Sequence, residues 1–336
     1  MAEVAVLPAR ITAFDRAKGI AIILIVALHV GPGLIVTGLM PDNAAMRFAE
    51  AWAYSFHVQV LFVIGGFLAW PRLYGWRFHV DRFAALYYPY LVWSVLSVTL
   101  AIVLPGANHA LGWGALLWLP VMPQLHFWFV PALLATTLVA GLIGRNDWLL
   151  VGLGVAGLAV SPYDFNWVQA GTYLPYLCLG VIMARHRWLP ATPAPLAWLS
   201  AIGSIGAAWL ALRHGWTFKD AVFFPIGLCG CYAVLALARA VDRGGAAVVL
   251  DYLGRKSLAI YLAHGLFATA ARIVWLRVFG AHAPWVAFVV CSAVGICGPV
   301  VLDELAGRIG LAEAIGLRPL RIGRWSRRTA DLPRPA

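Results

Sequence analysis

The sequence predicts an all-α, polytopic membrane protein: a helical bundle of about ten transmembrane helices with both termini in the cytoplasm. Three observations support this prediction. Of the 336 residues, 62% are hydrophobic and 12% are charged, whereas a soluble globular protein has about 25% charged residues. The apolar residues gather in stretches of membrane-spanning length, and the basic residues gather between alternate stretches. The composition excludes a soluble enzyme, and the two patterns give the number and direction of the spans.

An α-helix needs roughly 20 apolar residues to cross a bilayer. We expect spans near residues 19–40, 51–70, 84–104, 125–143, 147–162, 168–184, 194–212, 220–240, 257–279 and 284–304. The fifth stretch is short, which is also typical of a tilted or re-entrant segment. The apolar residues 111–123 fit an interfacial helix that does not span.

The basic residues orient these spans. If the N-terminus is cytoplasmic, the outer segments have few basic residues, namely Arg47, Arg213, Lys219 and Arg277. Most other Lys and Arg side chains then face the cytoplasm, which is the positive-inside pattern, and this requires an even number of spans. The bilayer therefore accounts for the net charge of +11. No basic run alternates with exposed aromatic residues, so we expect no nucleic-acid partner.

The chain divides into two parts by composition. We expect residues 1–305 to form one membrane-embedded domain and residues 306–336 to form a basic, partly disordered cytoplasmic tail. The five cysteines lie in apolar surroundings, and no two of them have the Cys-x-x-Cys spacing that is typical of zinc sites. Because a His-Glu-x-x-His sequence is also missing, we expect no metal.

The first apolar stretch places two ionisable side chains, Lys18 and His29, on one helix face. Eleven steps of about 100° return to within about 20° of the starting direction and cover about 16 Å. An ionisable group inside a bilayer costs about 2.5–3.5 kcal/mol on insertion scales, so His29 is a candidate site near mid-membrane. Its imidazole suits proton abstraction from a hydroxyl. A structural histidine, and a lysine that only orients the helix, are the alternatives.

Directly after His29 comes Gly31-Pro32-Gly33. Proline removes a backbone donor, and glycine is permissive, so we expect the helix to kink or unwind there and to open a polar cavity. In the second stretch, His57 and Gln59 are two positions apart. They cannot share a helix face well, so we expect one of them to be structural.

The inner loop 71–83 contains Arg72, Arg77 and Arg82. Guanidinium groups suit a clamp for phosphates, while positive-inside charge alone also explains these arginines. Two more histidines lie in apolar stretches: His126 at the predicted outer start of the fourth, and His264 in the ninth. For each of them, packing without a functional role is the alternative.

Several of these residues lie in recognisable motifs. Phe14-Asp15-Arg16-Ala17-Lys18-Gly19-Ile20, followed by an apolar run to His29, is similar to a family signature: a basic residue, ten intervening positions and a histidine. Further motifs follow in order, namely Ser55-Phe56-His57 with Leu61–Phe67, Tyr88–Ser94, His126–Val130 and Leu253–His264. Together they resemble the acyltransferase-3 family of integral membrane O-acyltransferases, particularly its fucose 4-O-acetylase-like branch. The resemblance covers, with gaps, about residues 10–305.

The chain departs from the family pattern at two places. The family usually has serine before the glycine of the second-helix motif, where Gly65 stands here. Many members also have two arginines three positions apart just before the third-helix proline. Here Arg82 is followed by Phe83-Ala84-Ala85-Leu86, so this pair is incomplete, and Arg72 and Arg77 are candidate substitutes.

The resemblance implies transfer of an acyl group, acetyl from acetyl-CoA in the simplest case, to a hydroxyl of a sugar in a surface glycan or glycolipid. His29 is then the general base, and the thioester reaches it along the first helix. The remaining candidate substrate-binding residues are Lys18, Arg72, Arg77, Arg82, His57 and His126, with the basic ones on the CoA phosphates. The resemblance also implies a multi-pass protein of the bacterial plasma membrane.

The group that orients His29 stays open at this point, because Asp164, Glu50 and a backbone carbonyl are all candidates. Two other functions also stay open. A transporter or flippase would use His29, His57 and His264 as a proton or substrate path. A catalytically inactive relative that serves as a scaffold would fit the incomplete arginine pair.

Overall fold

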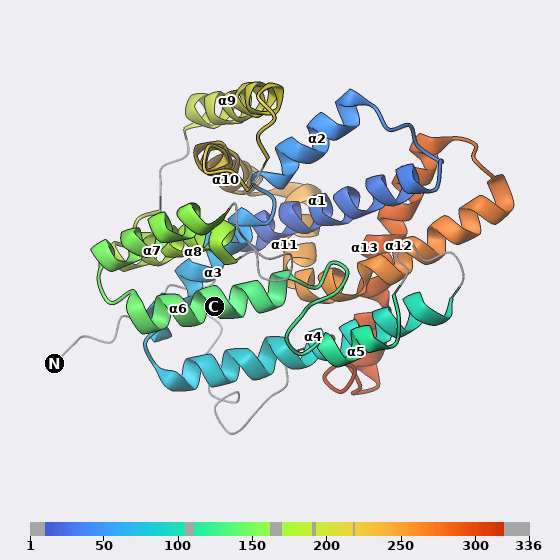
Figure 1. The fold of residues 1–336 in the computed structure, drawn as a ribbon, viewed down its shortest axis with the longest axis horizontal. Helices are drawn as coiled ribbons and strands as arrows, with labels where there is room; N and C mark the ends of the chain where they lie inside the picture. The colour runs from blue at the N-terminus through green and yellow to red at the C-terminus, as the bar shows by residue number, and fades with distance from the viewer. Residues whose placement is uncertain (1–10, 105–110, 162–169, 190–192, 218, 319–336) are drawn as a thin grey trace.

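The computed structural model describes residues 11–104, 111–161, 170–189, 193–217 and 219–318. These residues form an all-α bundle, as the composition predicts, with one short 3₁₀ helix, η1 (Trp70–Arg72). The α-helices are α1 (Thr12–Val36), α2 (Ala44–Tyr54), α3 (Gln59–Ala69), α4 (Trp76–Val103), α5 (Gly114–Trp118), α6 (Phe129–Ile143), α7 (Asp147–Val160), α8 (Ala170–Arg185), α9 (Ala194–Arg213), α10 (Phe223–Ala240), α11 (Gly244–Arg255), α12 (Ser257–Phe279) and α13 (Pro284–Arg308). Helix α1 lies within the bundle and contacts α3, α10, α11, α12 and α13 (Figure 1).

By length and composition, seven helical segments of the described chain can cross a membrane. They are α1, the run from α2 to η1, α4, α9, α10, α12 and α13. Helices α6 and α7 are apolar but shorter. The outward side chains of α9 are apolar and exposed, as for Trp198 at 69% and Leu199 at 68%, which suits contact with lipid. The chain is therefore a polytopic helical membrane protein, while the count of ten spans stays a prediction.

Helix α1 continues through Gly31-Pro32-Gly33 to Val36, so the expectation that it unwinds there is wrong. The turn that ends it lies further on, where Gly38 has a φ of +72°. Near this end the Gly33 carbonyl accepts two hydrogen bonds, from Nη1 of Arg272 at 3.0 Å and from Oγ1 of Thr37 at 3.2 Å. Donors from a cation and a hydroxyl stabilise a free carbonyl at a helix C-terminus.

Three predicted boundaries differ from the structure. The second span is broken into α2 and α3 by a turn over residues 55–58. The third predicted span corresponds to α4, which begins at Trp76. Arg77 and Arg82 therefore lie on the first turns of α4 and not in a loop. The fourth predicted span corresponds to α6, which begins at Phe129. It begins there because the chain turns just before it at Leu125, whose φ of +57° is left-handed. Hydropathy does not show such local backbone turns.

Two helix pairs pack so closely that only glycine fits between them. A Cβ atom at Gly180 of α8 would lie 2.0 Å from the Val63 carbonyl oxygen of α3, and one at Gly66 of α3 would lie 2.1 Å from the Leu177 carbonyl oxygen of α8. Close backbone approach at small residues is the usual way in which membrane helices associate. Gly19 of α1 and Gly254 of α11 make equally close contacts with the facing backbone.

At the end of α13, the buried Asp303 carboxylate pairs with Lys256 and with Arg318, at 2.5 and 2.9 Å. The segment between α13 and Arg318 lies against α4, where Nε1 of Trp93 donates to the Ile315 carbonyl at 3.0 Å. Residues 309–318 are thus packed on the bundle, and residues 319–336 of the predicted tail lie outside the described residues. The domain boundary at residue 305 stays a prediction.

Because the α3–α8 contact has no room for a methyl group, Gly180→Ala should lower the free energy of unfolding by about 2 kcal/mol or more. The control is Gly203→Ala in α9, where a Cβ atom would have no neighbour within 4 Å. The control should leave stability unchanged or raise it slightly, since alanine is the better helix former. Unfolding by SDS in mixed micelles measures both, and equal effects of the two substitutions would contradict the close contact.

Candidate active site

Three histidines from separate parts of the chain meet in the bundle and form a three-histidine cluster. They are His29 of α1, His126 of the turn before α6, and His264 of α12. Their ring centroids lie 5.0 Å apart for His29 and His264, 5.7 Å for His29 and His126, and 4.5 Å for His126 and His264. The sequence placed His126 at the outer face, at the start of a span, but the structure places its ring against that of His29.

The backbone around His126 explains how it reaches the cluster. The left-handed turn at Leu125 directs the chain toward α12, and the hydroxyl of Tyr261 donates to the His126 carbonyl at 2.8 Å. On α12, a Cβ atom at Gly265 would lie 2.9 Å from Cε1 of His126. Glycine at this position therefore leaves the space that the His126 ring occupies.

Hydrogen bonds to the backbone determine which nitrogen of each ring has the hydrogen. Nδ1 of His29 lies 2.7 Å from the Ile25 carbonyl, and Nδ1 of His264 lies 2.7 Å from the Tyr261 carbonyl. A carbonyl oxygen can only accept, so both Nδ1 atoms are donors, and in a neutral ring Nε2 then has a free lone pair. Among the candidate partners of His29, the structure thus shows a backbone carbonyl. Asp164 lies outside the described residues.

The Nε2 atoms of the three histidines in the cluster differ in their burial. Those of His126 and His264 are buried without a hydrogen-bond partner in the described chain, and the His264 side chain is fully buried. His29 is only half-buried, and its one hydrogen bond to a described residue uses Nδ1. Its Nε2 is consequently not committed to a protein partner. A nitrogen in this state can take a proton from a bound hydroxyl.

His57 lies beside this cluster, in the turn between α2 and α3. Its Nδ1 bonds to the Ala53 carbonyl at 2.8 Å, its side chain is buried, and it is close enough to His29 for an electrostatic interaction. Gln59 follows as the first residue of α3, with Nε2 donating to the Tyr54 carbonyl at 2.8 Å. The structure therefore places His57 near His29, while its role in substrate binding stays a prediction.

Lys18 lies toward the other end of α1. Its Nζ pairs with Oδ1 of Asp15 at 2.7 Å, and the side chain is about a quarter exposed. The adjacent Arg16 is buried and hydrogen-bonds to the Ala238 carbonyl and to Thr12, and pairs with Asp251. Arg16 thus joins α1 to α10 and α11. The sequence named Arg16 only as part of the first motif and did not indicate this structural role.

The three candidate arginines near η1 and α4 separate into a pair and a single residue. The guanidinium groups of Arg72 and Arg82 lie 5.8 and 5.6 Å from the centre of the Phe78 ring. Nε of Arg82 is buried without a partner, and neither arginine has an ion pair with a described carboxylate. Arg77 is exposed. Two adjacent cations without a described counter-ion form an anion-binding arrangement.

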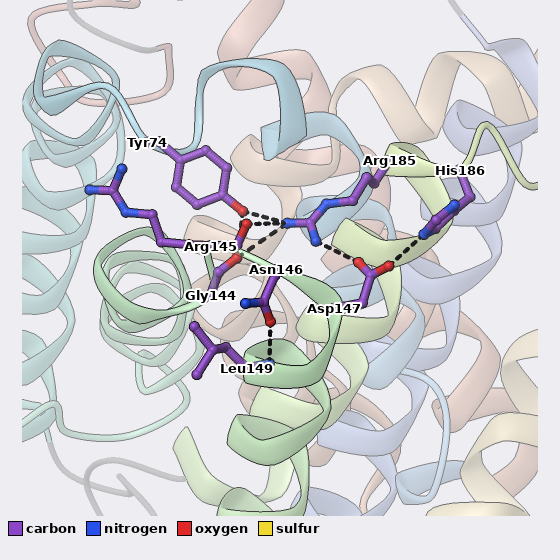
Figure 2. A network of polar contacts seen from close by, with 8 residues as sticks. All are labelled: Tyr74, Gly144, Arg145, Asn146, Asp147, Leu149, Arg185 and His186. Carbon is purple, nitrogen blue, oxygen red and sulfur yellow. Dashed lines mark hydrogen bonds and ion pairs between the residues drawn. The ribbon is translucent and has the colours of Figure 1, made fainter.

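A polar network holds the end of the bundle beside this pair (Figure 2). Arg185 of α8 pairs with Asp147 of α7 at 2.5 Å and donates to the Tyr74 hydroxyl at 2.7 Å, while this hydroxyl donates to the Gly144 carbonyl at 2.5 Å. The other Asp147 oxygen lies 2.6 Å from Nε2 of His186. Desolvation raises the pKa of Tyr74, although Arg185 opposes the shift. The hydroxyl therefore stays a neutral donor that joins the loop before α4 to α7 and α8.

Among the described residues, no three His, Cys, Asp or Glu side chains are arranged to hold a metal ion. In the three-histidine cluster the backbone occupies one nitrogen of His29 and one of His264, and the His29 ring meets the other two edge to face. The backbone bonds leave Nε2 of His29 and of His264 without a hydrogen-bond partner in the described chain.

A family model described as an acyltransferase domain, Acyl_transf_3, matches residues 11–304. This range contains the three-histidine cluster and the arginines of η1 and α4. Comparison with curated proteins and with solved structures finds no match.

Because Asp147 joins Arg185 and His186, Asp147→Asn should lower the free energy of unfolding by about 1–2 kcal/mol. The matched control is Asp42→Asn, which removes the exposed pair of Asp42 and Arg47, with side chains 55% and 61% exposed. Exposed pairs contribute little, so the control should change stability by about 0.5 kcal/mol or less. The network has no structural role if SDS titration gives the same midpoint for both variants.

Proposed function

The chain belongs to the acyltransferase-3 family, and on this premise we propose that it transfers an acyl group from acyl-CoA to a sugar hydroxyl. It is a membrane acyltransferase, so its reaction needs an acyl donor and an acceptor at the bilayer. We propose acetyl-CoA as the donor and a surface glycan or glycolipid as the acceptor. The observation that supports this function most directly is the uncommitted Nε2 of His29 inside the three-histidine cluster.

In the proposed mechanism, His29 acts as the general base. Its Nε2 takes the proton of the sugar hydroxyl while the hydroxyl oxygen attacks the thioester carbonyl carbon. The tetrahedral intermediate then loses the thiolate as the carbon–sulfur bond breaks, and Nε2 returns the proton to the sulfur. The products are the ester and free CoA. The Ile25 carbonyl keeps the hydrogen on Nδ1, so Nε2 is the atom that takes up the proton and later returns it.

The donor site of this proposal is built from cations. Arg72 and Arg82 converge on Phe78 without a described carboxylate, which suits the CoA phosphates. Arg77 and Lys18 supply further positive charge. Lys18 lies about 16 Å from His29 along α1, a span that the long pantetheine arm fits. In this proposal the rings of His57 and His126, which lie near His29, contact the sugar.

The other candidate functions make different expectations. A transporter or flippase would move its substrate unchanged and would not depend on acyl-CoA, and an inactive scaffold would show neither activity. The family match favours acyl transfer, and the resemblance of the sequence supports a fucose 4-O-acetylase-like sugar acceptor in a bacterial plasma membrane. Membranes given labelled acetyl-CoA and assayed for acetylated glycan separate the three possibilities.

Since His29 supplies the base, His29→Ala should lower transfer of labelled acetyl by about 100-fold or more. The variant should still insert into the membrane, because the residue makes one hydrogen bond within its own helix. His214→Ala is the control: His214 is exposed and stacks on Trp216 after α9, and its loss should have no effect. Transfer by the His29 variant within twofold of the unchanged protein would rule out this mechanism.

Arg82→Gln should raise the KM for acetyl-CoA about tenfold or more, because the phosphates lose a charged partner. The KM for acetyl-pantetheine, which lacks the nucleotide and its phosphates, should change little. Arg187→Gln serves as the control, since Arg187 is an exposed arginine after α8. If Arg82→Gln affects both donors equally, this arginine does not bind the phosphates.

A further inference from the structure

Two buried nitrogen atoms in the three-histidine cluster take part in no proton transfer of the mechanism above. They are Nε2 of His126 and Nε2 of His264, and neither has a hydrogen-bond partner in the described chain. The ring of His264 is fully buried. A buried polar atom without a partner loses its hydration without compensation, so each such atom in a native protein calls for an explanation, for example a bound molecule or ion.

The backbone determines what these atoms can bind. Nδ1 of His264 donates to the Tyr261 carbonyl, so its neutral ring presents Nε2 as an acceptor. The His126 ring lies against α12 beside Gly265, and its Nε2 can accept or donate, depending on the tautomer. No described residue bonds to either Nε2 atom, so both need a partner from another molecule. One hydroxyl can donate to Nε2 of His264 and accept from Nε2 of His126.

The position of the pair indicates which molecule supplies the donor. Both rings contact the ring of His29, at 5.0 and 5.7 Å between centroids. A hydroxyl that gives its proton to His29 would therefore have both unpartnered nitrogen atoms beside it. In a sugar, the nearest donor to a reacting hydroxyl is the hydroxyl on the next carbon. A lone alcohol would leave both nitrogen atoms unpaired.

We infer that His126 and His264 bind a second hydroxyl next to the one that is acylated, so that the site selects a vicinal diol over a lone alcohol. This inference rests on the proposed function, because it assumes that His29 holds the reacting hydroxyl. His264 is the deeper contact, and His126 closes the site from the turn before α6. The pair defines the acceptor class by chemistry: a sugar or polyol with two adjacent free hydroxyls.

The test is competition against transfer of labelled acetyl from acetyl-CoA to the acceptor in membranes that contain the protein. The probes are trans-1,2-cyclohexanediol and cyclohexanol, which differ by one adjacent hydroxyl. The diol should inhibit at a concentration about tenfold lower or more, because a site that hydrogen-bonds a hydroxyl rejects the analogue without it. Equal inhibition by the two probes, or none by either, would overturn the inference.

Substitutions then test whether His126 and His264 cause the preference for the diol. His264→Phe should remove this preference, while His264→Gln should keep much of it, since the Gln carbonyl oxygen can accept at about the position of Nε2. His126→Phe is the second variant in case the first does not fold, and His214→Phe is the matched control. For a variant without measurable transfer, calorimetric titration in nanodiscs with both probes gives the same comparison.

The outcomes separate this inference from the proposed function. Absence of labelled ester with the unchanged protein means that the proposed function fails. Transfer that occurs without preference for the diol means that only the inference fails. If His264→Phe raises the KM for acetyl-CoA and leaves the diol preference intact, the pair binds the donor, for example a pantetheine amide, and the inference is overturned.

Discussion

The hydrogen bond from Nδ1 of His29 to the Ile25 carbonyl is the interaction on which the proposed chemistry depends. A histidine in a membrane helix without such a bond can have its hydrogen on either nitrogen, and only one tautomer leaves Nε2 able to take a proton. The Ile25 carbonyl lies one turn earlier in α1, at 2.7 Å. The same helix therefore provides both the base and the group that orients it, and no acidic partner is needed.

The rest of the fold holds other groups against this base. Helix α12 brings His264, the turn at Leu125 brings His126, and the hydroxyl of Tyr261 fixes the backbone of that turn. Helix α1 itself is fixed by contacts with α11 at Gly19 and by the bond from Arg272 to its last turns. A site held between helices in this way is positioned more accurately than one on loops alone.

The sequence was sufficient to predict those features of the fold that depend on residues close together in the chain. Apolar stretches predicted the helices, and the spacing of Lys18 and His29 predicted a shared face of α1. It did not show that His126 would reach His29, because this depends on a left-handed turn at Leu125 and on the space left by Gly265. Nor did it show that the guanidinium groups of Arg72 and Arg82 would both lie near the ring of Phe78. The first is a contact between residues far apart in the chain, and the second depends on the turn between η1 and α4. Periodicity and hydropathy report neither.

The central claim is that Nε2 of His29 faces the reacting hydroxyl beside the thioester. An experimental structure with a non-reactive acetyl-CoA analogue, with the sulfur replaced by carbon, tests it most directly. In the reacting complex the hydroxyl oxygen hydrogen-bonds to the base and approaches the carbonyl carbon. The base and the carbon therefore lie within about 6 Å of each other. We expect the analogue's carbonyl carbon within that distance of Nε2, with the nucleotide at Arg72 and Arg82. A carbonyl bound away from the three-histidine cluster would contradict the assignment of His29 as the base.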